Sequence, residues 1–312
     1  MRIMLLVGAL LVASLSSPVA AQQTMSEEMK RRARLMEIMP ADAAKRHFGG
    51  TTSAARGEAR TIGSYARGCV AGATALALNG PTWQVMRTSR NRNWGHPEMI
   101  ALLERLAARA PKEANWPGLL VGDISQPRGG PMLTGHASHQ VGLDADIWLT
   151  RMPARRLNED ERENMPATNV VAPSWMDVDE SIWTPAHRDI VRLAALEPRV
   201  TRIFVNPAIK KAMCRDPGKD RDWLTKVRPM WGHNYHFHIR LGCPPGDAAC
   251  IDQDPPPDGD GCGKELSDWL TRQQKAIFAP KKPADPNAKP KPPVFLPLSS
   301  MPEACQTIVL QR

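Results

Sequence analysis

The spacing of apolar positions predicts three helices in the middle of the chain, over residues 97–110, 185–196 and 207–214. In the first, Met99, Leu102 and Leu106 recur at helical spacing, and Pro97 suits a first helical turn. Asn206 stands just before the third, where an asparagine side chain caps a helix well. Each of these helices has one apolar face, so each needs a partner surface to pack against.

Short apolar runs between these helices predict strands, within 116–125, at 144–149, at 202–205 and over 233–241. The first contains LLVGDIS and is followed by the turn-forming stretch QPRGGP. In the last, polar and apolar residues alternate from His236 onward, as in a strand that buries one face. We therefore expect an α+β fold, in which a small antiparallel sheet is flanked by helices and long loops.

Two further segments lack periodicity and predict loops. Residues 153–182 carry many prolines and charges, and loops of this length in compact domains are often functional. From Asp252 the chain becomes loop-like, and the stretch APKKPADPNAKPKPPVFLPL is too rich in proline for a packed core. We expect it to run over the surface in extended form.

The first residues, MRIMLLVGALLVASLSSPVAAQQ, have the pattern of a secretory signal peptide. Arg2 gives the positive start, residues 4–15 the apolar run, and residues 19–21 a small-residue cleavage site. The run is shorter than the roughly 20 residues of a spanning helix, so we expect cleavage after Ala21 and no membrane span afterwards. An uncleaved anchor is the alternative. Residues 25–46 then predict a surface helix or an extended arm.

Cysteine content and charge fit an exported protein. The chain has 6 cysteines, and in an exported protein an even number predicts disulfides, here with fifteen possible pairings. A thiolate metal site is the alternative, but no Cys-x-x-Cys pair occurs.

The net charge of +9 favours an anionic polymer or surface outside the cell, rather than nucleic acid, as the binding partner. Basic and acidic residues alternate, however, as on an ordinary solvated surface.

The segment WGHNYHFHIRLGC, residues 231–243, contains three of the chain's 8 histidines. On a strand, His236, His238 and Arg240 share one face, and the opposite face is apolar. A polar face turned to water is the alternative, but histidine is not a favoured solvating residue. Two imidazoles on one face suit a metal ligand beside a proton-transfer group. Arg240 would either orient a substrate carboxylate or form an ion pair.

The second polar constellation is GHASHQVGLDADIWL, residues 135–149. Asp144 and Asp146 share one strand face, about 6.5–7 Å apart, so we expect one to bind a metal and the other to support it. His136 and His139 lie in the preceding loop, where at least one can turn inward. Two histidines, one carboxylate and an open position are the ligand set of a hydrolytic zinc site. The chain has no His-Glu-x-x-His, so a histidine must act as the base.

These residues carry a resemblance. Over most of residues 65–270, the chain resembles the penicillin-insensitive murein endopeptidases. The motifs that carry this resemblance are, in order, GHASHQVGLDADIWL, TRIFVNPAIK, RDWLTKVRP, HNYHFHIRLGCP and GDGCG. The His-x6-Asp pair and the later His-x-His also fit the wider group of zinc peptidases that includes D-Ala-D-Ala carboxypeptidases and lysostaphin-like enzymes. The resemblance implies a zinc metalloendopeptidase that hydrolyses the D-alanyl–meso-diaminopimelate cross-link of peptidoglycan.

The resemblance also implies roles for single residues. His139, Asp146 and His238 would bind zinc, and His136 would belong to the site or serve as an alternative ligand. The family has been assigned a further Asp and His between the two motifs. The stretch SWMDVDESIW lacks histidine, so a second metal is not expected.

For catalysis, the resemblance implies that His236 takes the proton from zinc-activated water and that His233 orients this water or stabilises the oxyanion. Asp144 would support the ligands. A D-Ala-D-Ala carboxypeptidase with the same site is the nearest alternative function. A non-catalytic wall-binding protein that keeps the fold is the other.

We expect a signal peptide at residues 1–21 and an N-terminal helical or extended segment at 22–60. A zinc peptidase domain would follow at 61–270, with a proline-rich extension packed on it at 271–312. By resemblance, the disulfides would be Cys69–Cys305, Cys214–Cys262 and Cys243–Cys250. A wall built with diaminopimelate and a disulfide-bonded chain favour the periplasm as its location.

Overall fold

The computed structural model describes residues 27–218, 220–280 and 293–311. The signal peptide expected at residues 1–21 and most of the proline-rich stretch lie outside these residues. The helices are α1 (Glu27–Ile38), α2 (Ala44–Gly49), α3 (Pro97–Glu113), α4 (Glu159–Asn164), α5 (Pro185–Ala195), α6 (Pro207–Arg215), α7 (Lys264–Phe278) and α8 (Glu303–Leu310), with short 3-10 turns η1 (Thr88–Arg90), η2 (Asp222–Lys226) and η3 (Leu298–Ser300). Every helix in this described part is too short or too polar to cross a membrane.

The strands form one six-stranded sheet and two small two-stranded ones. They are β1 (Arg60–Ser64), β2 (Arg67–Ala71), β3 (Thr74–Ala75), β4 (Trp83–Val85), β5 (Trp94–Gly95), β6 (Leu119–Val121), β7 (Asp144–Trp148), β8 (Val200–Val205), β9 (Val227–Pro229) and β10 (His236–Leu241). The large sheet has the order β4-β6-β7-β10-β8-β9. Its central pairs are antiparallel, as expected, and its two outermost pairs are parallel. The expected α+β class is confirmed.

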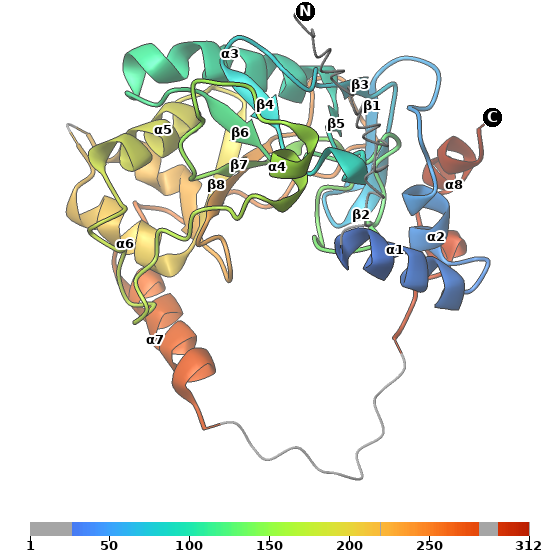
Figure 1. Cartoon of the computed structure of the whole chain (residues 1–312). Helices are drawn as coiled ribbons and strands as arrows, with labels where there is room; N and C mark the ends of the chain where they lie inside the picture. The colour runs from blue at the N-terminus through green and yellow to red at the C-terminus, as the bar shows by residue number, and fades with distance from the viewer. Residues whose placement is uncertain (1–26, 219, 281–292, 312) are drawn as a thin grey trace, which may run out of the picture.

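One apolar core fastens the helices to this sheet. Side chains from one face of β7 and β10, such as Ile147 and Phe237, join those of α3, α5 and α6 in a single buried cluster. Figure 1 shows α3, α5 and α6 around the β6–β7–β8 side, while α1, α2 and α8 lie beside the β1–β2 hairpin. Because this core takes one face of the central strands, their other face is available for polar groups.

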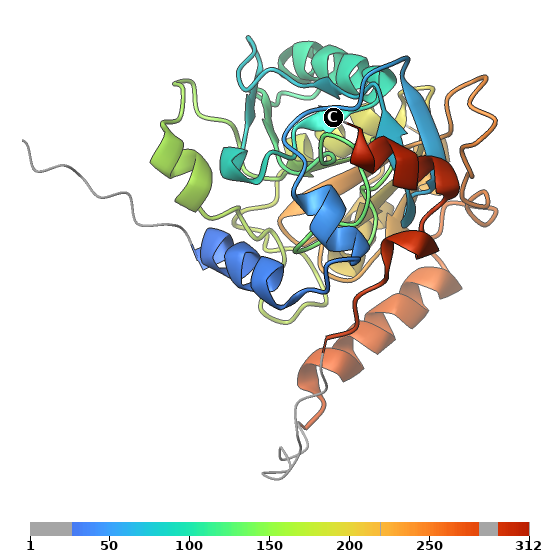
Figure 2. The same ribbon diagram turned by 90° about the vertical axis from the view of Figure 1, so that its right-hand side faces the viewer.

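A smaller core joins the two ends of the chain. Phe48 from α2, Ile62 from β1 and Ile308 from α8 pack there around the disulfide Cys69–Cys305. Figure 2 shows α2 and α8 next to each other on this side of the molecule. The cross-link spans 236 residues of sequence, and chain-entropy arguments give such long loops the largest stabilisation.

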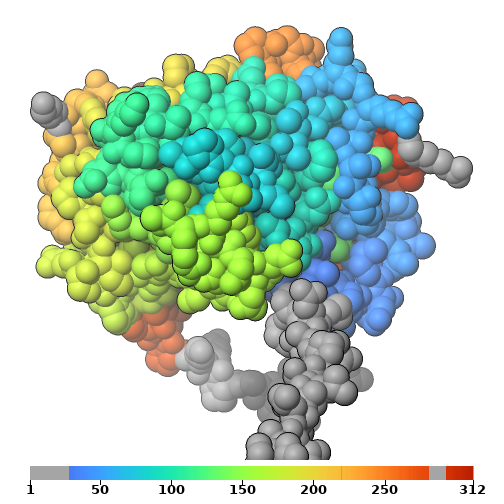
Figure 3. Space-filling model, turned by 45° about the horizontal axis from the view of Figure 1, so that its top comes forward, coloured from blue at the N-terminus to red at the C-terminus, as the bar shows by residue number. Residues whose placement is uncertain are grey.

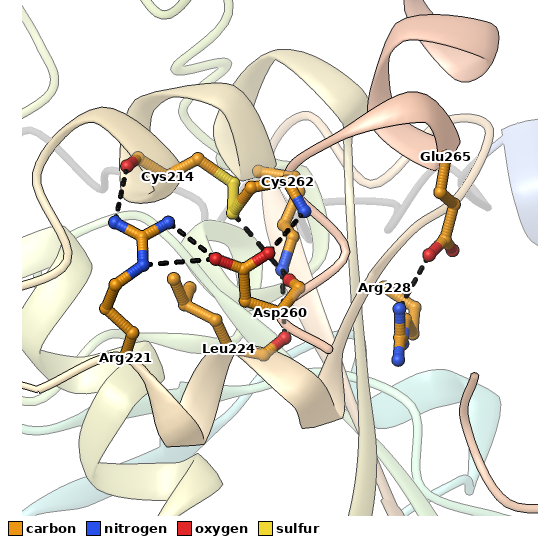
Figure 4. Close-up of a disulfide and its surroundings, with 8 residues drawn as sticks. Cys214, Arg221, Leu224, Arg228, Asp260, Cys262 and Glu265 are labelled. Carbon is orange, nitrogen blue, oxygen red and sulfur yellow. Dashed lines mark hydrogen bonds and ion pairs between the residues drawn. A yellow bond between two sulfur atoms is a disulfide. The ribbon is translucent and has the colours of Figure 1, made fainter. Parts of the chain in front are cut away.

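All three disulfide pairings expected from the resemblance are confirmed: Cys69–Cys305, Cys214–Cys262 and Cys243–Cys250. Cys214–Cys262 connects α6 to the turn before α7, and the side chain of Asp260 accepts hydrogen bonds from the Cys262 amide and from Arg221 beside it (Figure 4). In the same view Arg228 forms an ion pair with Glu265 at the start of α7.

Several sequence-based expectations were wrong in detail. The expected loop after Asp252 contains the amphipathic helix α7, whose pattern is hidden by the prolines around it, and the expected boundary at residue 270 falls inside this helix. The strand expected from His233 begins only at His236, because His233 has a left-handed backbone with φ 53°. Residues 25–46 give α1 and the start of α2 rather than one helix.

The long connection 153–182 is not entirely a loop. It contains α4, which Asn158 and Glu161 begin with a reciprocal capping box. In the space-filling view, the yellow-green residues of this connection lie across the front face (Figure 3). The β1–β2 hairpin and α8 were not anticipated from the sequence.

We expect Lys210 to make the free energy of unfolding depend on pH. It is fully buried in α6 and donates hydrogen bonds to the carbonyls of Leu224 and Asp260. Burial, with repulsion from Arg228, lowers the pKa of Lys210 to about 7. Between this value and the ordinary lysine pKa of 10.5, the unfolded chain binds a proton that the folded chain releases, so the free energy of unfolding should rise with pH across this window.

We predict that Lys210→Met removes most of this rise, whereas Lys112→Met, at an exposed position of α3, leaves it in place. Chemical denaturation at a series of pH values between 7 and 10 measures the slope. A Lys210→Met variant with the wild-type slope would contradict the prediction.

Candidate metal centre

The register of β7 and β10 brings the two polar constellations together. His238 lies directly opposite Asp146, and Arg240 lies opposite Asp144. Directly opposed residues of an antiparallel pair point to the same face, so these four side chains share the face of the sheet that the apolar core leaves free. All four are buried.

His139 reaches this face from the loop before β7. Its backbone is left-handed, with φ 64°, and its amide donates to Asp144 Oδ2 at 2.9 Å. Its ring Nδ1 lies 2.7 Å from the carbonyl oxygen of Ile124. Because a carbonyl can only accept, Nδ1 carries a proton, and Nε2 is the nitrogen that faces the cluster as a possible ligand.

His238 is held in the opposite tautomer. Its Nε2 lies 2.9 Å from Asp144 Oδ1, so this nitrogen donates and Nδ1 is left with a lone pair. That Nδ1 lies 3.2 Å from His139 Nε2. Asp144 also accepts hydrogen bonds from Arg240, at 2.7 and 3.2 Å. Of the two roles expected for Arg240, the ion pair is therefore the one present, and Asp144 orients both histidines from behind.

Asp146 lies at the centre of the cluster. Its Oδ1 is 3.4 Å from His139 Nε2, 3.4 Å from His238 Nδ1 and 3.6 Å from His236 Nε2. This oxygen is buried and accepts no hydrogen bond. A buried carboxylate oxygen that faces two imidazole nitrogens is costly unless a proton or a metal cation occupies the space between them.

His136 lies on the outer side of the cluster. Its Nε2 is 3.5 Å from Asp146 Oδ2 and 3.0 Å from Asp123 Oδ2. His136, His139 and Asp146 offer ligand atoms that all lie within 4.8 Å of one another. His136 is thus near enough to bind an ion, but its Nε2 is engaged by Asp123, unlike the free nitrogens of His139 and His238.

Asp123 was missed in the sequence. It follows β6 in the run LLVGDIS, where it looks like the polar end of a buried strand. Its carboxylate is buried beside Arg92, at 2.8 Å, and Arg90, at 3.2 Å, and its backbone carbonyl accepts from the Asp146 amide. A carboxylate directly after a strand that neighbours β7 was the available signal.

The two expected catalytic histidines border the same cluster. His236 is buried and its Nδ1 has no hydrogen-bond partner, while its ring lies 4.8 Å from that of His233. His233 Nδ1 lies 2.7 Å from the carbonyl oxygen of Trp231, so its Nε2 is the free nitrogen. The structure therefore gathers the six residues expected at the site, three on β7 and β10 and three from the loops before them.

Burial and charge set the protonation of these groups. Burial lowers the pKa of His236 to about 4 and that of His238 to about 3, so both rings are neutral near pH 7. Burial also disfavours charge on His139, but the Asp146 carboxylate outweighs it and raises the pKa of His139 to about 9, so near pH 7 a proton on Nε2 takes the place beside Asp146 that a cation would fill. Burial alone would raise the pKa of Asp146, yet the surrounding imidazoles hold it well below its usual range. The site is thus a carboxylate that attracts positive charge, which suits a divalent cation.

Two other histidines have structural roles. His96 caps α3 by accepting a hydrogen bond from the Glu98 amide. His187 is buried, where it caps α5 with Thr184 and packs between Trp116 and Trp183.

Comparisons with known proteins agree with this geometry. Residues 61–310 match the family model described as penicillin-insensitive murein endopeptidase. The chain is 52% identical over 239 residues to a penicillin-insensitive murein endopeptidase of Haemophilus influenzae, covering 75% of this chain and 79% of that protein. It is 42% identical over 254 residues to one of Klebsiella pneumoniae, covering 81% and 87%.

We predict that Asp144→Asn weakens zinc binding by roughly 10–100-fold, because the amide no longer fixes the ligand tautomer of His238. Asp258→Asn, at an exposed position, should bind zinc like the wild type. Competition with a fluorescent chelator measures both affinities. In Asp144→Asn the buried Arg240 loses its ion-pair partner. The double variant Asp144→Asn, Arg240→Met removes this unpaired cation and should show the same loss of zinc affinity. Wild-type affinity in both Asp144 variants would contradict this role.

Proposed function

The chain belongs to the penicillin-insensitive murein endopeptidase family, and we propose that it is a zinc enzyme that hydrolyses the D-alanyl–meso-diaminopimelate cross-link of peptidoglycan. It is a peptidase of the murein endopeptidase type, and peptidoglycan is its substrate polymer. The observation that carries the zinc proposal is the buried Asp146 Oδ1, which lies within 3.4 Å of His139 Nε2 and His238 Nδ1 and accepts no hydrogen bond.

We assign His139 Nε2, His238 Nδ1 and the Asp146 carboxylate as the zinc ligands, with His136 as the alternative fourth. Two imidazoles and one carboxylate with a position left open form the ligand set of catalytic zinc. When bound there, zinc lowers the pKa of water and polarises a carbonyl group. One ion is proposed, held by the face that β7 and β10 share.

His236 is proposed as the general base. Its low pKa leaves the ring neutral near pH 7, and its Nε2 lies 3.6 Å from Asp146 Oδ1, so in the tautomer with the proton on Nδ1 this nitrogen can accept a proton from the attacking water. Accepting that proton creates an imidazolium next to the Asp146 carboxylate, which stabilises it. The same histidine can then give the proton to the departing amine.

His233 is proposed to orient the water. Burial lowers the pKa of His233, so the ring is neutral, and its Nδ1–H is committed to the Trp231 carbonyl. The free Nε2 can accept a hydrogen bond but cannot donate one. Of the two roles expected for His233, this geometry favours orienting water over stabilising an oxyanion.

The proposed location is the periplasm. Three disulfides and the similarity to murein endopeptidases support a location outside the cytoplasm. The N-terminal pattern of a signal peptide supports export, and a net charge of +9 suits an anionic wall polymer.

We predict that His236→Ala lowers kcat on cross-linked muropeptide dimers by about 100-fold or more while the variant keeps its zinc, because proton transfer is lost and the ligands remain. His47→Ala, in α2, serves as the control and should cleave normally. Mass spectrometry of the digests and metal analysis give both readouts.

Conversion of dimers to monomers by the wild type is the expected result. Release of free D-alanine without loss of dimers would show a carboxypeptidase instead. Bound zinc with neither reaction would identify a wall-binding protein.

A further inference from the structure

A hollow of about 430 Å³ leads away from the metal cluster. Its walls come from α1, from the segment around η1, from the loop at Thr134–His136 and from the segment before β10. A second hollow of about 250 Å³ adjoins it and reaches Asp146. Arg90 lines both hollows, as do His136 and His236, so its guanidinium lies where a substrate would pass from one to the other.

Most charged groups of the larger hollow are already engaged. The Glu28 carboxylate accepts from the Thr134 hydroxyl, and Arg92 donates to Asp123 and to Thr134. Arg90 donates to Asp123 through Nη1 alone, at 3.2 Å, and its Nε is buried without an acceptor. Arg31, exposed on α1, has no ion pair among the described residues. Arg92 also has a buried Nε without an acceptor, but both of its terminal nitrogens are engaged, so Arg90 and Arg31 are the two cations of this hollow with spare terminal donors.

Arg90 is held in place by its backbone. It ends η1 between Arg87 and Asn91, which both have left-handed φ angles. Glu163 accepts hydrogen bonds from Ser89 Oγ and from the Ser89 amide, both at 2.8 Å, and Arg32 of α1 donates to the Ser89 carbonyl. A strained turn fixed from two sides presents its side chain in one position, and such strain is common at binding sites.

We propose that Arg90, assisted by Arg31, binds the free carboxylate that stands beside the scissile bond of the substrate. This inference rests on the proposed function. In a D-alanyl–diaminopimelate link, the scissile nitrogen is attached to a carbon that also bears an unlinked carboxylate. A guanidinium with unused donors that lines the same hollow as Asp146 and His236 matches that anion, because arginine forms paired hydrogen bonds with carboxylates. Arg31 precedes residue 61, where the family match begins, so α1 adds a basic wall to the cleft.

The test compares two cross-linked dimers, one with this carboxylate free and one with it amidated. For the free acid, Arg90→Gln should raise KM about tenfold or more, the loss expected for a charge-assisted hydrogen bond. Arg31→Gln should raise KM by about two- to fivefold, as for a more exposed pair. Neither variant should change KM for the amidated dimer. Arg34→Gln, on the same helix but outside this hollow, is the matched control and should behave like the wild type.

Metal analysis separates binding from structural damage, because Arg90 also touches Asp123. Zinc loss in Arg90→Gln, with the preference for the free acid retained, would overturn the inference. So would wild-type enzyme that cleaves both dimers with equal KM, a result that leaves the endopeptidase proposal standing. If the wild-type enzyme cleaves neither dimer, both the endopeptidase proposal and the role of Arg90 are contradicted.

Discussion

The pairing of β7 with β10 is the constraint on which the site depends. With His238 opposite Asp146 and Arg240 opposite Asp144, one face of two central strands carries two carboxylates, the imidazoles of His236 and His238, and a guanidinium. A register shift of one residue would turn these groups into the core and the apolar side chains outward. Burial of Ile147 and Phe237 on the other face therefore fixes the polar geometry as well as the fold.

The buried charges on this face are balanced unequally. Asp144 is paired with Arg240, and Asp123 with Arg92, each at hydrogen-bonding distance. Asp146 faces only imidazoles, of which His236 and His238 are neutral near pH 7 because burial lowers their pKa values. Asp144 and Asp123 are thus each paired with an arginine, whereas Asp146 is not. This difference distinguishes a place for a cation from a structural ion pair.

The sequence predicted what local pattern determines. Strand parity placed Asp144 with Asp146 and His236 with His238, and helical spacing gave α3, α5 and α6 within a few residues. Asp123 was missed although its place just after a strand was a signal, and Arg90 could not be predicted, because the roles of both depend on contacts across strands and loops far apart in sequence. The helix α7 was missed because its flanking prolines dominated the local composition. The disulfides came from family resemblance, since cysteine spacing alone allows fifteen pairings.

Zinc-edge anomalous diffraction from crystals of the zinc-loaded protein would locate the metal relative to its ligands. We expect one peak, bonded to His139 Nε2, His238 Nδ1 and Asp146 at about 2.0–2.2 Å. A peak held by His136 and Asp123 without His238 would contradict the assignment of ligands. The absence of any peak at Asp146 would contradict the metal centre itself.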